Sequence, residues 1–440
     1  MSYKVVDLFC GAGGFSKGFD KNPAFFVTSG VDVNETAVDT FTQTHDGDGI
    51  TADIKETDPF EVLPESSHTP TVVIGSPPCQ GFSDARGSRY IDDERNGLVF
   101  EFIRWVDLLS PEIFVMENVL GMRTISDDFI DAIQREFSDC GYEDTTVLTV
   151  TASEYGVPQK RKRLFIIGAK DTNNIESDIT IPPCSPPSVK QALQDLPEVV
   201  DDLHTRVEVS QSKDAESEYA TVVRDSDSTT HHVAKEPSET GLHILKQLQP
   251  GEMYRSNRFG DRYRGVWDLF KDEFTETQRD ILYFIAKHRS RKEYRIKGKT
   301  VGPVDVELIY PELSQDLTSI DTEIKSLLDD GWIRDDTVDG RYGIDINTKS
   351  GIRPRYMRLT PDEPANTILT TDFTPREKAH PFKNRGLSLR EGARIQSFPD
   401  SFNFVGSFSE VADQIGNAVP PVLAYQLSKG LQEELQSCDD

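Results

Sequence analysis

Residues 7 to 18 read Asp-Leu-Phe-Cys-Gly-Ala-Gly-Gly-Phe-Ser-Lys-Gly and continue a strand-like pattern that starts at Lys4. A strand that runs into small residues and then into a helix lets the backbone approach a ligand closely, as nucleotide sites of α/β proteins do. The spacing departs from G-x-G-x-x-G, because Ser16 stands where the third glycine is expected after Gly11 and Gly13. The stretch therefore predicts an α/β ligand-binding turn and disfavours a nicotinamide cofactor.

The first 170 residues alternate short β-branched runs with amphipathic segments, which is typical of an α/β domain with a largely parallel sheet. A chain of 440 residues exceeds what one hydrophobic core usually serves, so two domains are expected. The predicted strands cover residues 4–9, 26–31, 72–74, 113–116, 146–151 and 163–168, and the predicted helices include residues 97–109 and 127–140.

The middle of the chain has a different composition. Residues 201–240 hold ten acids, four bases and many Ser and Thr, which predicts a surface or poorly ordered stretch. Residues 275–288 and 319–329 have helical apolar periodicity, and residues 332–346 read as a hairpin around a polar turn. Two helices and a hairpin are compatible with a winged-helix DNA reader and equally with a generic helical subdomain.

The net charge of −27 argues, taken alone, against a nucleic acid partner. Local charge differs, because residues 159–163 carry four bases in five positions and residues 287–299 carry seven bases and one acid. Acidic surfaces also keep proteins soluble in concentrated salt. We therefore hypothesise a halophilic protein, which a melting curve in molar potassium chloride would test.

The five cysteines show no C-x-x-C spacing, so neither a disulfide framework nor a zinc site is expected. No stretch is long and apolar enough to span a bilayer, and the N-terminus lacks the pattern of a signal peptide. These features predict a cytoplasmic protein without a membrane segment.

Residues 75 to 83 read Gly-Ser-Pro-Pro-Cys-Gln-Gly-Phe-Ser and follow an apolar run. Pro77 and Pro78 fix two φ angles, so the chain leaves the predicted strand in a preset direction. A nucleophilic cysteine has to be a partly exposed thiolate, and Cys79 on such a loop fits that role. An ordinary turn that contains a cysteine fits the nine residues as well.

Acidic residues follow several predicted strands. Asp32 is placed to accept hydrogen bonds from ribose hydroxyls, and Asp53 suits an adenine amino group, although either acid alone is more often a cap or turn residue. Glu117 ends an apolar strand and is expected to be partly desolvated, which favours holding a proton. Arg161 and Arg163 share one face of an extended segment and can grip a carboxylate, a phosphate or a base oxygen.

Taken in order, and together with residues 385–400 and 414–421, these motifs resemble those of the cytosine-5 DNA methyltransferases. The resemblance covers about the first 170 and the last 60 residues, and the unmatched middle is where that family carries its variable target-recognition domain. It implies an α/β fold, namely the Rossmann-like parallel sheet of S-adenosylmethionine-dependent methyltransferases, plus a smaller target-recognition domain. The implied catalytic domain is 1–175 with 410–440, and the implied target-recognition domain is 176–409, including the stretch 201–240 and the module 275–346.

The resemblance also implies methyl transfer to carbon 5 of a cytosine flipped out of the duplex. Cys79 would add to carbon 6, while Glu117 would bind ring nitrogen 3 and the exocyclic amine. Arg163 would contact the base oxygen, and Arg161 would help to position the base and Cys79. The residues implied at the DNA, or on a mobile loop over it, are Gln80, Ser83 and Gln159.

S-adenosylmethionine is the implied cofactor, with S-adenosylhomocysteine as its product and no metal. The residues that match cofactor-facing positions of the family are Phe9, Gly11, Gly13, Gly14, Asp32, Asp53, Ile54, Pro78, Leu98, Asn417 and Val419.

The implied partner is double-stranded DNA, with a cognate endonuclease of a restriction-modification system as a further possible partner and a monomeric state expected. A tRNA-methylating branch shares the motifs but has a short middle region, whereas about 200 residues separate Gly168 from Leu369 here. Glu117 excludes RNA methyltransferases that carry a second cysteine at that position. A non-catalytic DNA-binding regulator stays open as an alternative, which the intact Cys79, Glu117 and arginine pair disfavour.

Overall fold

The computed structural model describes residues 2–78, 97–122, 127–170, 179, 181–209, 218–255, 264–270, 272–289, 291, 293–294, 303–309, 317–337, 340–347 and 355–437. The chain divides into two units. The first comprises Met1–Val233, Asp362–Thr371 and Ser388–Asp440, and the second comprises Ala234–Pro361 and Asp372–Leu387. These limits differ from the domain boundaries after residues 175 and 409 that the family resemblance implies.

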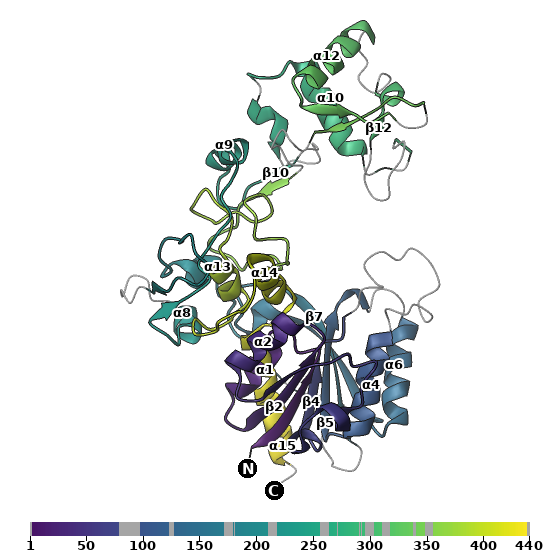
Figure 1. Ribbon diagram of the computed structural model, residues 1–440, viewed down its shortest axis with the longest axis vertical. Coiled ribbons are helices and arrows are strands. Elements are labelled where there is room, and N and C mark those ends of the chain that lie inside the picture. Colours follow the sequence, from purple (N-terminus) through teal and green to yellow (C-terminus); the bar gives the residue numbers. More distant parts are fainter. Residues whose placement is uncertain are drawn as a thin grey trace. The chain divides into compact units, whose positions relative to one another are not determined.

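The first unit contains a seven-stranded sheet in the order β3-β2-β1-β4-β5-β7-β6 (Figure 1). Strand β7 runs antiparallel to β5 and β6, and the other neighbouring strands are parallel. The predicted α/β class with a largely parallel sheet is therefore confirmed. The strands are β1 (Tyr3–Leu8), β2 (Phe25–Asp32), β3 (Asp48–Thr51), β4 (Val72–Gly75), β5 (Ile113–Val119), β6 (Thr145–Thr151) and β7 (Lys162–Ala169).

Apolar side chains cover both faces of this sheet, because successive residues of a strand point to opposite faces. Val5 and Val72 pack with helices α1, α2 and α15 on one face. Their neighbours Val6 and Val73 pack with α4 and α6 on the other. The bounds of the helices are α1 (Gly14–Asp20), α2 (Glu35–Thr44), α3 (Pro59–Val62), α4 (Gly97–Leu109), α6 (Asp127–Asp139) and α15 (Pro421–Ser437).

The C-terminal segment returns to the N-terminal strands through α13 (Leu389–Ile395), α14 (Phe408–Asn417) and α15. Helix α15 packs directly on α1, since an ideal Cβ on Gly18 would lie 2.3 Å from Cβ of Ala424 (Figure 1). The first unit is thus assembled from segments that are far apart in the sequence.

Residues 181–233 of the first unit contain α7 (Val189–Leu193), β8 (Val207–Glu208), α8 (Glu218–Val223) and β9 (Ser228–Thr229). The expected surface or poorly ordered character of residues 201–240 is wrong for Thr229 to His232, which are buried. His232, for example, is completely buried and hydrogen bonds through Nδ1 to Oγ of Ser388 at 2.9 Å. Polar composition hid this burial, because the partners lie about 150 residues away in the sequence.

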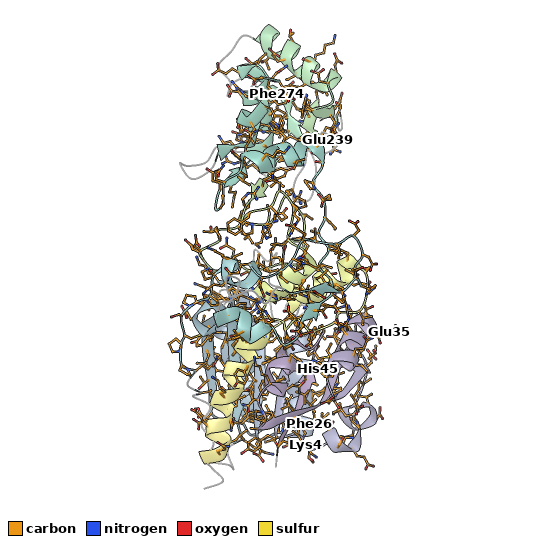
Figure 2. All side chains as sticks on the ribbon, turned by 90° about the vertical axis from the view of Figure 1, so that its left-hand side faces the viewer. Lys4, Phe26, Glu35, His45, Glu239 and Phe274 are labelled. Carbon is orange, nitrogen blue, oxygen red and sulfur yellow. The ribbon has the colours of Figure 1, made fainter. Side chains whose placement is uncertain are left out.

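The second unit has its own apolar core, which includes Trp267, Ile281 and Phe274. Phe274 is labelled in Figure 2. Its two small sheets have the orders β11-β10-β15 and β12-β14-β13. The predicted helices at residues 275–288 and 319–329 are confirmed. The predicted hairpin is confirmed because β13 and β14 pair antiparallel. The elements are α9 (Glu239–Gln247), β10 (Met253–Arg255), β11 (Arg264–Gly265), α10 (Glu276–His288), β12 (Val304–Asp305), α12 (Leu317–Asp329), β13 (Ile333–Asp335), β14 (Gly343–Ile346) and β15 (Arg355–Met357).

In the part of the chain that the structure describes, no helix is long and apolar enough to cross a membrane.

Candidate active site

The turn between β1 and α1 has an unusual backbone. Phe9, Gly11 and Gly13 have φ angles of 59°, 52° and 85°, in the left-handed region that favours glycine. An ideal Cβ on Gly13 would lie 2.2 Å from Nε2 of His45, a residue labelled in Figure 2, and one on Gly14 would lie 2.6 Å from the Val419 carbonyl oxygen. Among the described residues, a Cβ on Gly11 would meet no atom within 4 Å. Gly13 and Gly14 therefore permit close packing, whereas Gly11 borders open space.

Asp32 ends β2 beside this turn. Its Oδ2 accepts a hydrogen bond from the Gly11 backbone N–H at 2.9 Å, and its Oδ1 accepts one from the Asn34 N–H at 2.9 Å. Burial raises the pKa of the Asp32 carboxyl, and these backbone donors oppose that effect. The next residue, Val33, is 69% exposed. A carboxylate and an exposed apolar side chain thus stand together at this strand end.

Asp53 and Ile54 follow β3 and are fixed by α4. The Ile54 carbonyl accepts hydrogen bonds from Nη2 of Arg104 at 2.6 Å and from Nε1 of Trp105 at 3.2 Å. Asp53 Oδ1 accepts the Lys55 backbone N–H at 3.0 Å. Leu98, in the first turn of α4, is partly buried. These contacts explain how a short segment with little secondary structure keeps a defined position.

Three further predicted ligand contacts come from the ends of other elements. Val419 is 3% exposed and follows α14, with its carbonyl oxygen against Gly14. Asn417, the last residue of α14, is exposed, as is Pro78 after β4. The structure therefore brings Val419 to the glycine turn, and it leaves Asn417 and Pro78 accessible.

Glu117 and Arg163 form an ion pair at the ends of β5 and β7. Oε1 of Glu117 and Nε of Arg163 are 2.6 Å apart, and the side chains are 9% and 12% exposed. Arg163 pairs with Val119 in the antiparallel register. Glu117 lies two residues before Val119, so the side chains of Glu117 and Arg163 are on the same face of the sheet. Each charge is largely removed from water, so removal of one partner would leave the other buried and unpaired.

Asn118 connects this ion pair to the end of β4. Its Nδ2 donates to the Pro77 carbonyl oxygen at 3.0 Å, two residues before Cys79. Cys79, Gln80 and Ser83 themselves lie outside the described residues, so their predicted placement stays a prediction. The Pro77 carbonyl, just before the cysteine segment, is thus tied to the residue that follows Glu117.

Arg161 is 2% exposed and makes contacts that differ from those predicted for it. Its Nη1 donates to the carbonyl oxygens of Ile368 and Gly416 at 3.2 and 3.1 Å, and its Nη2 lies 3.5 Å from the Asn417 carbonyl oxygen. Burial, with a smaller contribution from the like charge of Arg163, lowers the pKa of Arg161 to about 9. The guanidinium of Arg161 is thus held by neutral carbonyl groups.

Gln159 is completely buried. Its Oε1 accepts the Ile368 backbone N–H at 2.7 Å, and its Nε2 donates to Oε1 of Gln396. The side chain therefore faces the protein interior, whereas the sequence prediction placed it at DNA or on a mobile loop.

Val33 and Gln396 were not among the predicted site residues. An apolar residue directly after an acid at a strand end was a usable signal for Val33. Gln396 lies in the motif 385–400, but nothing in its sequence neighbourhood indicates which groups its amide meets.

Comparison with known proteins shows which family this chain matches. The family model for the C-5 cytosine-specific DNA methylases matches residues 3–433. The type II methyltransferase M.AgeI of Thalassovita gelatinovora is 30% identical over 98% of this chain and 99% of its own length. The type II methyltransferase M.DdeI of Desulfomicrobium norvegicum is 31% identical over 97% of this chain and 87% of its own.

A solved structure supports the fold. The protein is encoded within an E. coli prophage and described as a DNA modification methyltransferase, and it has a TM-score of 0.65 at 23% identity over 99% of this chain and 100% of its own. The order of the motifs, the mixed seven-stranded sheet and the match along nearly the whole chain lead to one conclusion. The chain belongs to the C-5 cytosine-specific DNA methylase family and is a DNA (cytosine-5-)-methyltransferase.

Proposed function

We propose that this methyltransferase acts through a covalent adduct between Cys79 and carbon 6 of a cytosine flipped out of duplex DNA. The observation that carries the proposal is the buried ion pair between Glu117 and Arg163, tied through Asn118 to the Pro77 carbonyl at the base of the cysteine segment. The guanidinium can donate to the carbonyl oxygen of a cytosine, and the carboxyl beside it can accept from the exocyclic amine and, when it carries a proton, donate to ring nitrogen 3.

Carbon 5 of cytosine is a poor nucleophile, so a group has to add to carbon 6 first. The Cys79 thiolate forms the bond to carbon 6, and Glu117 shares a proton with ring nitrogen 3, which stabilises the charge that develops in the ring. Arg163 donates to the base oxygen. After carbon 5 has accepted the methyl group, its proton passes to water, and the bond between Cys79 and carbon 6 breaks, which releases the thiolate and restores the aromatic ring.

S-adenosylmethionine, when bound, supplies the methyl group. The residues at the glycine turn fit this molecule, because Gly11 borders open space, Asp32 offers acceptor lone pairs to ribose hydroxyls and Val33 offers exposed apolar surface. We assign Asp53 and Ile54 to the adenine and the remaining predicted cofactor residues to the same site. This assignment rests on the donor set and on the resemblance to the family.

We further propose that the second unit takes part in target recognition, within the predicted region 176–409. Its hairpin carries Arg334 and Arg341, whose side chains are 53% and 58% exposed although each pairs with a buried aspartate, Asp345 and Asp305 respectively. Arginines held by such pairs keep donors for DNA. A cognate endonuclease and a monomeric state remain part of the proposal.

The test is to treat DNA with the purified protein and S-adenosylmethionine and to map methylated cytosines by sequencing. Cys79→Ser is expected to abolish methylation, since a serine hydroxyl is a far weaker nucleophile at neutral pH. Cys184→Ser is the matched control, because Cys184 is an exposed cysteine, and this variant is expected to methylate like the wild type. Unchanged methylation by Cys79→Ser would overturn the mechanism.

A further inference from the structure

The C-terminal end of α14 is held by two buried side chains. Residues 415–418 present four consecutive backbone carbonyls, and the last carbonyls of a helix have no partner inside the helix. Nε2 of Gln396 donates to the carbonyls of Ile415 and Ala418 at 2.9 and 3.0 Å. Arg161 donates to the carbonyls of Gly416 and Asn417. Side chains from two distant motifs thus take all four acceptors.

Arg161 has an additional electrostatic reason to lie there. The C-terminal end of a helix carries a partial negative charge, and a cation close to it is stabilised. Arg161 points at this end with its two Nη atoms, and its Nε has no partner among the described residues. The neutral carbonyls are therefore what holds the buried charge, which ties the position of the α14 end to Arg161.

Gln396 is fixed by Gln159. Both side chains are completely buried, and Oε1 of Gln396 accepts a hydrogen bond from Nε2 of Gln159. This contact orients the Gln396 amide so that its two N–H groups point at α14. The backbone of Ile368 completes the network by donating to Gln159 and accepting from Arg161.

The segment that follows α14 forms one side of the glycine turn. Gly14 would place an added Cβ 2.6 Å from the Val419 carbonyl oxygen and 3.0 Å from Cβ of Ala418. There is no free space between the two segments, so a shift of residues 415–419 moves the backbone that faces the turn. Asn417 and Val419 lie within residues 415–419, so such a shift would move them as well.

We infer that Arg161 and Gln396 are positioning residues for cofactor binding, which act by fixing the end of α14 against the glycine turn. Arg163, two residues from Arg161, faces Glu117 instead. Two arginines of one motif therefore serve opposite sides of the site. The inference rests on the proposed S-adenosylmethionine site and deepens it, because it names the residues that shape the site without touching the ligand.

The experiment measures binding of S-adenosylhomocysteine to the full-length protein by calorimetry, without DNA. Arg161→Lys and Gln396→Met each remove donors from carbonyls at the end of α14. Both are expected to raise the Kd by about tenfold or more, because buried acceptors lose their partners and the segment relaxes. At saturating cofactor, kcat for methylation by Gln396→Met is expected to fall by less than about threefold, because the Gln396 amide bonds to Gln159 and to the end of α14.

Arg390→Lys is the matched control. Arg390 is also completely buried, and among the described residues its guanidinium donates to carbonyls, those of Thr230, Pro399 and Phe402, at 3.0, 3.0 and 2.7 Å. Burial likewise lowers its pKa, to about 10. This variant is expected to lower the melting temperature but to leave the Kd within about twofold of the wild type.

The outcomes separate the inference from the proposed function. A wild-type protein that binds no S-adenosylhomocysteine contradicts the proposed site itself. A wild type that binds, together with folded Arg161→Lys and Gln396→Met variants that bind equally well, overturns only the inference. If both variants fail to fold, hydrogen exchange of the wild type decides: ligand binding is expected to slow exchange at residues 415–419, and unchanged exchange there overturns the inference.

Discussion

The two sides of the site stabilise buried charge in opposite ways. On the side proposed to hold the base, which we call the base side, Glu117 and Arg163 neutralise each other at 2.6 Å. On the side proposed for the cofactor, the charge of Arg161 meets neutral carbonyl oxygens. Burial there also favours the neutral form of Asp7 in β1, whose Oδ2 lies 2.6 Å from Oγ of Ser16 and whose Oδ1 has no partner among the described residues.

The difference teaches where each side is sensitive. A buried ion pair tolerates small shifts in the positions of its partners, but the protein is strongly destabilised when either partner is removed. A charge held by neutral dipoles depends on the positions of those dipoles and on pH. The base side is therefore expected to respond to changes of charge, and the cofactor side to changes of packing and protonation.

The largest effect is expected from Glu117→Gln. The substitution keeps the shape, leaves Arg163 without its counter-charge and removes the group proposed to share a proton with the base. We expect kcat to fall by about 100-fold or more, in the range known for loss of a preorganised electrostatic contact. Steady-state methylation assays measure this, and the Kd for S-adenosylhomocysteine is expected to stay unchanged.

Glu363→Gln is the control for that variant, since Glu363 pairs with Lys160 at 2.8 Å on the exposed surface. Exposed pairs contribute little to stability. A kcat for Glu117→Gln close to that of Glu363→Gln would contradict the role proposed for the buried pair.

A smaller effect, confined to the cofactor side, is expected from Gly14→Ala. The new Cβ would stand 2.6 Å from the Val419 carbonyl oxygen, so the backbone of one segment has to move. We expect the Kd for S-adenosylhomocysteine to rise by about tenfold, measured by calorimetry. Gly121→Ala is the control, because its nearest neighbour would lie at an ordinary 3.8 Å. Equal affinities of the two variants would show that the packing at Gly14 does not shape the site.

The smallest effect is expected from Asp7→Asn, and it depends on pH. Burial raises the pKa of Asp7 from 3.8 to about 8, with Asp32 and Asp20 adding smaller contributions. The folded state thus keeps a proton that the unfolded state loses above about pH 4, and this stability is lost as the pH rises towards 8. Asparagine cannot ionise, so its contribution to stability does not fall as the pH rises. The melting temperature of the variant minus that of the wild type is therefore expected to be several degrees larger at pH 9 than at pH 5.

Melting curves at the two pH values measure this gain as a difference between the variant and the wild type. A difference that does not change with pH would mean that Asp7 ionises in the folded protein as it does in the unfolded chain.

Much of the fold could be predicted because local sequence patterns specify it. The β-branched runs gave the core strands, and the periodicity of residues 275–288 gave α10 almost to the residue. Residues 229–232 were predicted less well, since their polar side chains become buried only through contacts with a segment beyond residue 385. Asp32 and Glu117 could be placed at strand ends from spacing alone, but Gln396 could not be connected to any partner.

The sequence by itself determined the family, the glycine turn and the order of the chemical groups, because these depend on residue type and on spacing within single strands and turns. Only the tertiary structure decided what Arg161 and Arg163 each contact. Two residues apart on one extended segment, they are equivalent in the sequence. Their difference arises because Arg163 meets a carboxylate on β5, whereas Arg161 meets the end of a helix more than 240 residues away. Such partners follow from packing, which no local pattern records.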